Sequence, residues 1–210
     1  MSEILHFLNP EYLLATFGGL FFGISCLIIF AETGLLLGFF LPGDSLLFAL
    51  GLFIGRGDID IPLWLAVLLL AISAFAGDQT GYWIGRKLGP AIFKKPKSKL
   101  FNPKNVEAAH TFFEKYGSRA VVLAHFVPIM RTFIPVSAGI AKMDWRRYTI
   151  FNLVGISGWA VGIPLLGSWL GNFEIVRENL EIALLLFVGV SFIPIALEIV
   201  KGYLENKKKN

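Results

Sequence analysis

Two stretches of the chain carry no charged residue over a length that crosses a membrane. Residues 12–31 are uncharged over 20 positions, and residues 148–173 are uncharged over 26. A helix rises about 1.5 Å per residue, so roughly 20 residues cross a hydrocarbon core of about 30 Å. The pattern therefore predicts an all-α membrane protein, with one spanning helix over 12–31 and another over about 147–171.

Two shorter apolar segments follow the first long one, and a carboxylate separates them. Residues 33–43 and 45–55 are each 11 residues long, with Asp44 between them. Each segment extends only about 17 Å as a helix, roughly half the bilayer. Pro42 has no amide hydrogen and Gly43 is flexible, so we expect the helix to break there. The pattern predicts a re-entrant hairpin, whose irregular backbone must be buried in protein or line a water-filled cavity.

The next apolar segment, residues 61–89, predicts a second spanning helix with a smooth face. Glycine recurs at every fourth position in its later half, at Gly77, Gly81, Gly85 and Gly89. Small residues at this spacing favour close helix packing in membranes. Asp78 lies in the same half, where it either lines a cavity or satisfies a backbone break near the membrane edge. The basic, weakly amphipathic residues 90–118 are expected in the cytoplasm.

Residues 120–141 repeat the hairpin pattern. One arm covers 120–130 and carries His125, the other covers 132–141, and Arg131 separates them. Both hairpins contain a similar tripeptide, Phe40-Leu41-Pro42 in the first and Phe126-Val127-Pro128 in the second. The residues expected to shape or support the two breaks are Pro42, Gly43, Asp78, Pro128, Pro135 and Gly139.

The pattern as a whole predicts about four transmembrane helices and two re-entrant hairpins in a single polytopic domain, residues 1–210. Four crossings place both termini on one side, so the two hairpins enter from opposite sides as an inverted repeat, which is common in transporters. The expected parts are 12–55 for the first helix and hairpin, 61–89 for the second helix, 90–118 for the cytoplasmic segment, 120–141 for the second hairpin, 147–201 for the last two helices and 202–210 for a basic tail.

Composition and charge agree with this prediction. Hydrophobic residues make up 55% of the chain, and the mean hydropathy is +0.67. The net charge of +4 does not indicate nucleic-acid binding, because the basic residues cluster in 86–119 and in the final lysines. Such clusters mark the cytoplasmic side of a membrane protein, so both termini are expected there. The first ten residues carry Glu3 and no Lys or Arg, unlike a signal-peptide n-region.

Four ionisable residues lie within apolar segments: Glu32, Asp44, His125 and Arg131. A charge at the centre of a membrane helix costs about 2.5–3.5 kcal/mol on insertion scales, so it is rarely kept without a partner or a use. In one interpretation the two carboxylates form a structural ion-pair cluster with Arg131, and Glu32 alone also fits an interfacial position. In the other, Arg131 binds a phosphate with help from His125, and Glu32 and Asp44 carry protons. A guanidinium presents a planar fork that suits phosphate.

No motif indicates an enzyme. The chain has no G-x-S-x-G sequence and no P-loop, and its three histidines do not form a zinc site at recognised spacing. We therefore expect no catalytic activity, no metal and no cofactor.

Four motifs together resemble the DedA family of bacterial inner-membrane proteins, also called the SNARE-associated or VTT domain family. In chain order they are FLPGDSLL (40–47) with Glu32 before it, GDQTGYWIGRKLG (77–89), HFVPIMRTFIPVSAG (125–139) and FNLVGISGW (151–159). The resemblance implies facing re-entrant hairpins and lipid translocation. It associates bacterial members with recycling of undecaprenyl phosphate driven by the proton motive force, and others with phosphatidylethanolamine flipping or with scrambling.

The family's embedded acids correspond to Glu32 and Asp44, and its arginine corresponds to Arg131. Many members carry a second arginine where this chain has His125, whose charge depends on pH. Either one permanent cation holds the phosphate, or the site is more sensitive to pH.

The function expected from these features is proton-dependent flipping of undecaprenyl phosphate, or a similar anionic lipid, in the bacterial inner membrane. The alternatives are a general phospholipid scramblase, a proton-coupled small-ion antiporter and a membrane scaffold. Lipid transport predicts a groove open sideways to the bilayer, and ion transport predicts a closed aqueous path. The expected partners are membrane lipids and protons, without nucleic acid, and the sequence also allows a homo-oligomer.

Overall fold

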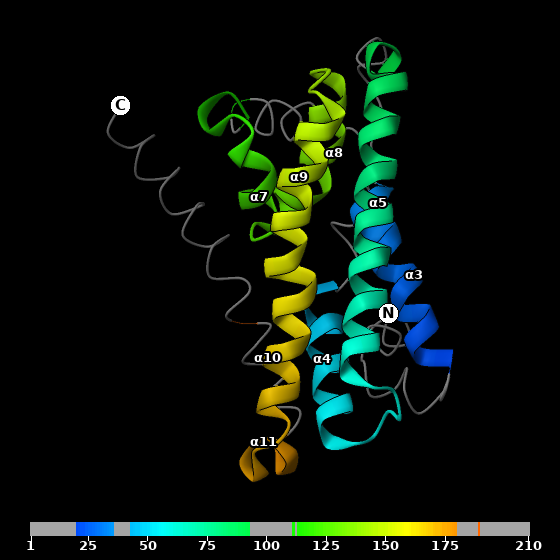
Figure 1. The fold of residues 1–210 in the computed structure, drawn as a ribbon, viewed down its shortest axis with the longest axis vertical. Helices are drawn as coiled ribbons and strands as arrows, with labels where there is room; N and C mark the ends of the chain where they lie inside the picture. The colour runs from blue at the N-terminus through cyan, green and yellow to red at the C-terminus, as the bar shows by residue number, and fades with distance from the viewer. Residues whose placement is uncertain (1–19, 36–42, 93–110, 112, 180–188, 190–210) are drawn as a thin grey trace, which may run out of the picture.

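The computed structural model describes residues 20–35, 43–92, 111, 113–179 and 189. Within these ranges every regular element is helical (Figure 1). The elements in chain order are α3 (Phe21–Gly34), α4 (Gly43–Arg56), α5 (Leu63–Ile92), α7 (Arg119–Ala124), α8 (Pro128–Ile140), α9 (Trp145–Ile156), η3 (Ser157–Val161), α10 (Gly162–Leu170) and α11 (Glu174–Glu178).

Two helical stretches are long and apolar enough to cross a membrane. One covers Leu63–Lys87 in α5, and the other covers Trp145–Leu170, where α9, η3 and α10 form one continuous helix. Both expose large apolar side chains, among them Trp64, Ile72 and Ile150. Exposed apolar surface of this kind suits a lipid environment, so the fold supports the predicted membrane class. The expected last helix within 182–201 and the start of the first helix lie outside the described residues.

The first interrupted helix differs from the prediction. α3 continues through Glu32 to Gly34, so Glu32 lies inside the last turn of a helix rather than between a spanning helix and a half-helix. A buried carboxylate does not end a helix when it finds a partner from another segment. α4 begins at Gly43 with Asp44 in its first turn, and the predicted break at Pro42 falls in the undescribed residues 36–42.

The second interrupted helix breaks before Arg131 rather than at it. α7 ends at Ala124 and α8 begins at Pro128, so the break covers residues 125–127. The prediction that Arg131 separates two arms is therefore wrong, because Arg131 lies within α8. Pro128 explains the position of the break: it occupies the start of α8, where its missing amide hydrogen costs nothing, and Val127 before it is extended.

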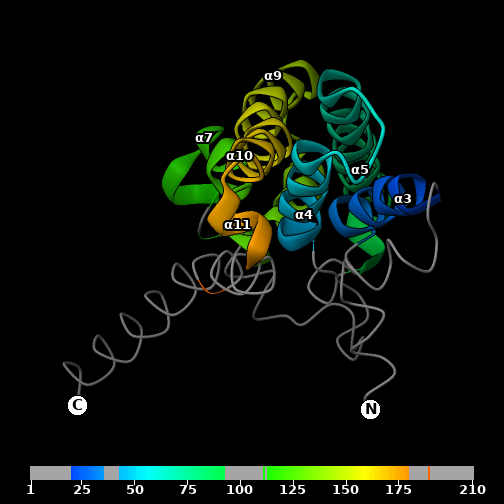
Figure 2. The same cartoon turned by 90° about the horizontal axis from the view of Figure 1, so that it is seen from below.

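The interrupted helices pack on the long helices through glycines. The positions where a Cβ at Gly51 and Gly55 of α4 would lie are 2.1 and 2.4 Å from the backbone oxygens of Pro164 and Ser168 in α10. On the other side of the molecule, α8 packs along α5. α4, which follows the first break, thus packs on α10 of the second half of the chain, and α8, which follows the second break, packs on α5 of the first half. This exchange of partners is the packing expected of an inverted repeat. Figure 2 shows α4 between α10 and α5.

The predicted glycine face of the second helix is confirmed at three of its four positions. A Cβ at Gly77 would lie 2.0 Å from Thr33 Oγ1 in α3, and one at Gly85 would lie 2.1 Å from the Val136 oxygen in α8. Gly81 approaches Pro135 more loosely, at 3.2 Å. The surroundings of Gly89 lie outside the described side chains. α5 is therefore the element against which both interrupted helices are positioned.

The ends of the described molecule agree with the predicted arrangement. In Figure 1 the loop between α4 and α5 lies at the same end as α11, whereas the end of α5 and the junction of α8 and α9 lie at the opposite end. α4 runs from the middle of the molecule toward the first end, and α8 runs from the middle toward the second. The starts of α4 and α8 therefore both lie near mid-height. How the helices cross a membrane, with both termini in the cytoplasm, stays a prediction.

Candidate functional site

Arg131 of α8 lies between the two predicted carboxylates. Its Nη1 donates to Asp44 Oδ1 at 2.6 Å, and its Nη2 donates to Glu32 Oε1. Arg131 and Glu32 are almost fully buried, and Asp44 is partly buried. Three helices thus bring one cation and two anions together near the starts of α4 and α8. This is the arrangement expected of the structural ion-pair cluster, and it also places the predicted substrate and proton residues in direct contact.

The charges in this cluster do not balance. With all three groups ionised, one positive and two negative charges sum to −1. Two further polar atoms, Glu32 Oε2 and Arg131 Nε, are buried and have no hydrogen-bond partner among the described residues. Buried charge without compensation is costly, so the cluster favours binding one more positive charge, of which a proton is the smallest.

Gly43 makes room for Glu32. A Cβ added at Gly43 would lie 1.5 Å from Glu32 Oε2, which is far inside contact distance. A larger residue at position 43 therefore requires the Glu32 carboxylate to leave the position in which it contacts Arg131. The glycine predicted to break the helix has this second role, which the sequence did not indicate.

Trp159 completes the surroundings of Arg131. The guanidinium carbon lies 4.0 Å from the centre of the Trp159 ring, and the indole N–H donates to Asp44 Oδ1 at 2.6 Å. Such a cation–π contact is worth about 2 kcal/mol or more when desolvated. Trp159 lies in the π-helical turn η3, which interrupts the long helix, and turns of this kind are frequent at functional sites.

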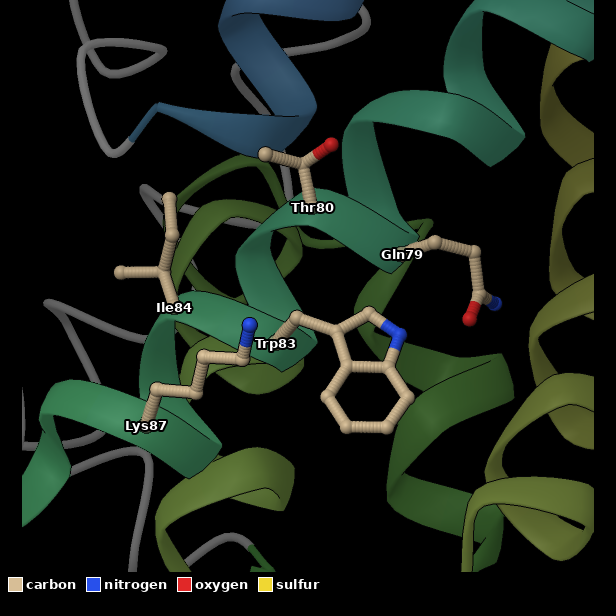
Figure 3. Close-up of a pocket in the computed structure, with 5 residues that line it drawn as sticks. All are labelled: Gln79, Thr80, Trp83, Ile84 and Lys87. Atoms are coloured by element: carbon tan, nitrogen blue, oxygen red, sulfur yellow. The ribbon is translucent and has the colours of Figure 1, made fainter.

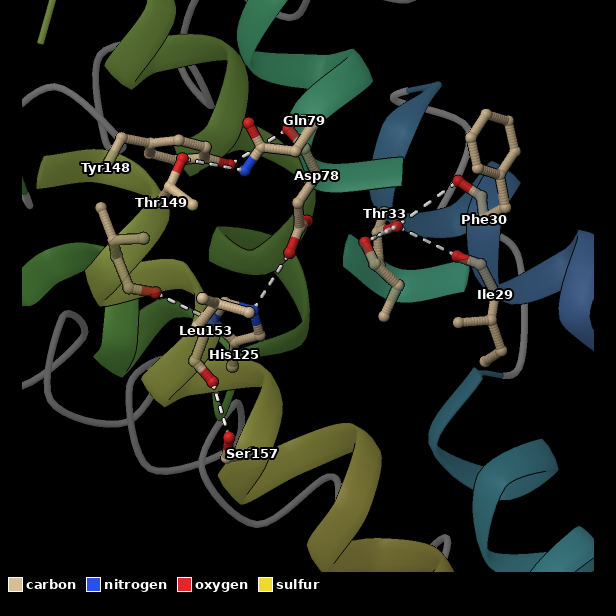
Figure 4. Close-up of polar contacts among 12 residues, drawn as sticks. Ile29, Phe30, Thr33, Asp78, Gln79, His125, Tyr148, Thr149, Leu153 and Ser157 are labelled. Atoms are coloured by element: carbon tan, nitrogen blue, oxygen red, sulfur yellow. Dashed lines mark hydrogen bonds and ion pairs between the residues drawn. The ribbon is translucent and has the colours of Figure 1, made fainter. Parts of the chain in front are cut away.

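His125 and Asp78 form a second buried polar pair (Figure 4). His125 Nε2 lies 3.2 Å from Asp78 Oδ2, and Nδ1 lies 2.9 Å from the backbone oxygen of Val121. Both ring nitrogens therefore face protein oxygens. The role of His125 as a phosphate ligand stays a prediction, but in this conformation the ring is held by α5 and α7 rather than directed at Arg131.

Aromatic residues extend this second pair toward one end of the molecule. Tyr148 donates from its hydroxyl to the Asp78 backbone oxygen at 3.0 Å and stacks on Tyr82, with ring centres 4.5 Å apart. Tyr82 in turn donates to the Met143 oxygen at 2.5 Å, and Arg86 contacts the same hydroxyl. These contacts fix the later half of α5 against the start of α9.

An open pocket of about 420 Å³ lies on the outer face of α5 (Figure 3). Its lining residues all come from that helix: Gln79, Thr80, Trp83, Ile84 and Lys87. None of them contacts Arg131 or its carboxylates, so we do not place the functional site there.

The structure brings the predicted residues together in two groups. Glu32, Asp44 and Arg131 form one, and Asp78 pairs with His125 in the other. Of the predicted support residues, Pro135 lies inside α8, and a Cβ at Gly139 would lie 2.0 Å from the Tyr82 backbone oxygen.

Sequence reasoning missed Trp159 and the buried Asn152, although both lie in the quoted motif FNLVGISGW. A polar asparagine within an uncharged helix is a signal that could have found Asn152, whereas a tryptophan there gives no such signal.

The fold and the site define an α-helical protein of the membrane class, with two helices long and apolar enough to cross a bilayer and a buried arginine–carboxylate cluster between its helices. Residues 41–169 match the VTT domain, which covers more than half of the chain. The chain belongs to this family, the DedA family, as the motifs predicted.

Several similar proteins are named as membrane proteins, and another is named Protein DedA. The uncharacterized membrane protein ML0287 of Mycobacterium leprae is 46% identical over 84% of this chain and 78% of its own length. Protein DedA of Escherichia coli is 37% identical over 94% and 91%. The inner membrane protein YqjA of Escherichia coli is 32% identical over 73% and 69%. No solved structure matches the chain significantly. The chain is therefore a membrane protein.

Proposed function

We propose that the chain translocates an anionic lipid, a polyprenyl phosphate such as undecaprenyl phosphate, between the leaflets of a bacterial inner membrane in a proton-dependent cycle. The observation that carries this proposal is the single buried guanidinium held by two carboxylates. Intramembrane ionisable residues that face the protein interior mark substrate and proton pathways in transporters. Membership of the DedA family and the membrane location of the named relatives support a transport role.

The geometry suggests how a proton and a phosphate are coupled. In the described conformation both terminal nitrogens of Arg131 are engaged by Glu32 and Asp44. A proton bound to Glu32 removes the negative charge that competes for the guanidinium. The freed Nη2 and the neighbouring Nε then donate to two oxygens of a phosphate, the bidentate geometry that arginine favours. When the phosphate leaves, Glu32 releases its proton and closes on Arg131 again.

Many members of the family carry a second arginine where this chain has His125, so Arg131 is the one permanent cation among the described residues of this cluster. We infer that this cation alone anchors the phosphate in the present chain. The long apolar tail of a polyprenyl lipid remains in the bilayer, and the exposed apolar surfaces of the long helices suit that contact. Transport of this kind involves no covalent chemistry.

The excess negative charge of the cluster favours one alternative function, a proton-coupled antiporter for a small cation. Two carboxylates in one cavity suit a cation as well as a proton, and Arg131 then only balances charge. The two functions differ in what moves with the proton.

Reconstitution in liposomes separates these functions. The purified chain is tested with labelled undecaprenyl phosphate, with labelled phospholipids and with a small-cation reporter, each with and without an imposed pH gradient. The proposal expects polyprenyl phosphate to move faster than phospholipid, with a rate that follows the gradient. Equal movement of all lipids without gradient dependence indicates a scramblase and contradicts it, and cation flux without lipid movement indicates the antiporter.

A further inference from the structure

We propose that Asp78 and His125 form a second proton-binding site, separate from the Arg131 cluster, that binds one proton between Asp78 Oδ2 and His125 Nε2. The inference rests on the proposed function for its role in transport. The presence of the site itself follows from hydrogen-bond chemistry and is tested separately. In the proposed cycle both residues position the charges around the phosphate site and do not touch the lipid.

The hydrogen bond to Val121 fixes one end of the imidazole. A backbone carbonyl oxygen accepts hydrogen bonds and never donates them, so Nδ1, at 2.9 Å from that oxygen, carries a hydrogen. The other ring nitrogen, Nε2, then has two states. It either carries a second hydrogen and donates to the Asp78 carboxylate, or it accepts a hydrogen from a protonated Asp78.

Both states contain the same number of protons. An imidazolium beside a carboxylate and a neutral imidazole beside a carboxylic acid each have zero net charge. Without this proton, a lone pair on Nε2 would face a carboxylate oxygen at 3.2 Å in the protein interior. Burial makes that arrangement unfavourable, since both residues are at most 3% exposed. The pair therefore binds one proton in the described conformation.

The surroundings leave room for that proton to exchange. The Asn152 side chain lies close enough to interact with the Asp78 carboxylate, although neither its polar atoms nor Asp78 Oδ1 make a well-formed hydrogen bond to a described residue. A buried polar group without a protein partner commonly binds water. A water held between Asp78 and Asn152 would give the shared proton a path for exchange.

The charged and polar groups that act on the pair come from three further helices. They are Glu32 of α3, Arg131 of α8, and Tyr148 and Asn152 of α9, while Asp44 of α4 acts on Glu32. Arg131 and Glu32 both act electrostatically on Asp78. When the pair loses its proton, it adds a second uncompensated negative charge beside a cluster that already sums to −1. Proton loss at the pair thus favours proton binding at Glu32.

Trp159 joins the two sites physically. The Arg131 guanidinium carbon lies 4.0 Å from the centre of the Trp159 ring. The centre of the His125 ring lies 6.4 Å from the centre of the same Trp159 ring. The His125 ring is also held close to α9, because a Cβ at Gly155 would lie 2.3 Å from Nδ1. A movement of His125 on proton loss therefore reaches the residue that holds Arg131.

The first test observes the proton directly. A His6→Gln/His110→Gln variant leaves His125 as the sole histidine, and the full chain in lipid is labelled with ¹⁵N-histidine for solid-state NMR across a pH series. We expect Nδ1 to stay protonated throughout and the Nε2 resonance to change when Asp78→Asn is introduced. A neutral ring with hydrogen on Nε2 and none on Nδ1, or spectra unaffected by Asp78→Asn, overturns the proposal. This result does not depend on which substrate is transported.

The second test separates a proton site from a purely structural contact. Asp78→Asn/His125→Gln replaces the pair by neutral amides of similar size, and transport is measured against pH for any substrate that moves in liposomes. We expect the midpoint of the pH profile to move by about one unit or more, the size of a tenfold change in proton affinity. A double variant with unchanged rate and unchanged pH profile overturns the proposal. If the double variant does not fold, the NMR measurement alone decides.

Discussion

Gly43 shows how a residue without a side chain makes space for a charged group of the site. Glu32 reaches Arg131 through the space that any Cβ at Gly43 would occupy. Gly23, in the same region of the chain, has no atom of the described residues within 4 Å of its added Cβ. The two glycines thus form a matched pair for testing whether the position of Glu32 matters.

Gly43→Ala is expected to displace Glu32 from Arg131. Inserting a methyl group into packed surroundings costs typically about 1–3 kcal/mol, and here it also disturbs a buried ion pair. We expect a lower thermal midpoint in detergent and loss of gradient-driven lipid movement. Gly23→Ala is expected to leave both unchanged, and equal behaviour of the two variants would show that Glu32 does not depend on this space.

Trp159→Phe keeps an aromatic face for Arg131 and removes the indole N–H that Asp44 accepts. Hydrogen bonds to charged groups contribute about 1.5–3 kcal/mol, so stability measured by thermal unfolding should fall by an amount in that range. Trp169→Phe is the control, since that side chain is 60% exposed. We expect a clear transport defect in Trp159→Phe and none in Trp169→Phe. A Trp159→Phe protein with full stability and transport contradicts the role given to the N–H.

The sequence identified the charged members of the site but not their pairing. Glu32, Asp44 and Arg131 are conspicuous because charges are rare in apolar segments. The partnership of Asp78 with His125 depends on how α5 packs on α7, which no local pattern records. Trp159 was missed for a related reason. The sequence of an uncharged helix does not tell whether an indole faces lipid or protein, and the contacts of Trp159 with Arg131 and Asp44 depend on how η3 packs.

The helices themselves are held together by close backbone contact rather than by large side chains. Gly51 and Gly55 let α4 approach the α10 backbone, and a Cβ at Gly167 would lie 2.3 Å from the Phe48 oxygen in return. Small residues allow such approaches in membranes, where van der Waals packing and hydrogen bonds replace the hydrophobic effect between helices. The position of Asp44 at the start of α4 depends on this contact.

Gly51→Ala should therefore displace Asp44 from the site, although residue 51 itself does not contact Arg131. Its Cβ would lie 2.1 Å from the Pro164 oxygen, and a backbone atom cannot move aside cheaply. We expect a loss of about 1–3 kcal/mol in unfolding free energy with reduced transport. Gly162→Ala on the partner helix, where nothing lies within 4 Å, should change neither. A tolerated Gly51→Ala would mean that α4 and α10 are not closely packed.

At the level of elements, the sequence predicted which segments are interrupted but not where. The sequence predicts the second break at Arg131, because this charged residue separates two uncharged segments. Pro128 fixes it instead, three residues earlier, through its restraint on the preceding backbone. Arg131 consequently lies on a formed helix, which holds its guanidinium more rigidly than an irregular loop.

The whole molecule is predicted to present the α4–α5 loop and α11 on one side of the membrane and the start of α7 on the other. Single cysteines test this in a Cys26→Ser background, because Cys26 is the one native cysteine. Asp60→Cys and Glu174→Cys should react with an impermeant maleimide in intact spheroplasts. Lys115→Cys should react only after the membrane is opened. Labelling of all three from outside would contradict the inverted arrangement.

In the proposed cycle Glu32 and a lipid phosphate compete for Arg131, and a proton on Glu32 decides which of them binds. The most direct measurement is the affinity of the purified chain for a short-chain polyprenyl phosphate, titrated across pH for the wild type, for Glu32→Gln and for Asp60→Asn, an exposed carboxylate that serves as the control. We expect the wild type and Asp60→Asn to bind the polyprenyl phosphate more tightly as pH falls. Glu32→Gln should bind it tightly already at neutral pH, with little dependence of the affinity on pH. A Glu32→Gln protein with the affinity and pH dependence of the wild type would contradict the proposed cycle.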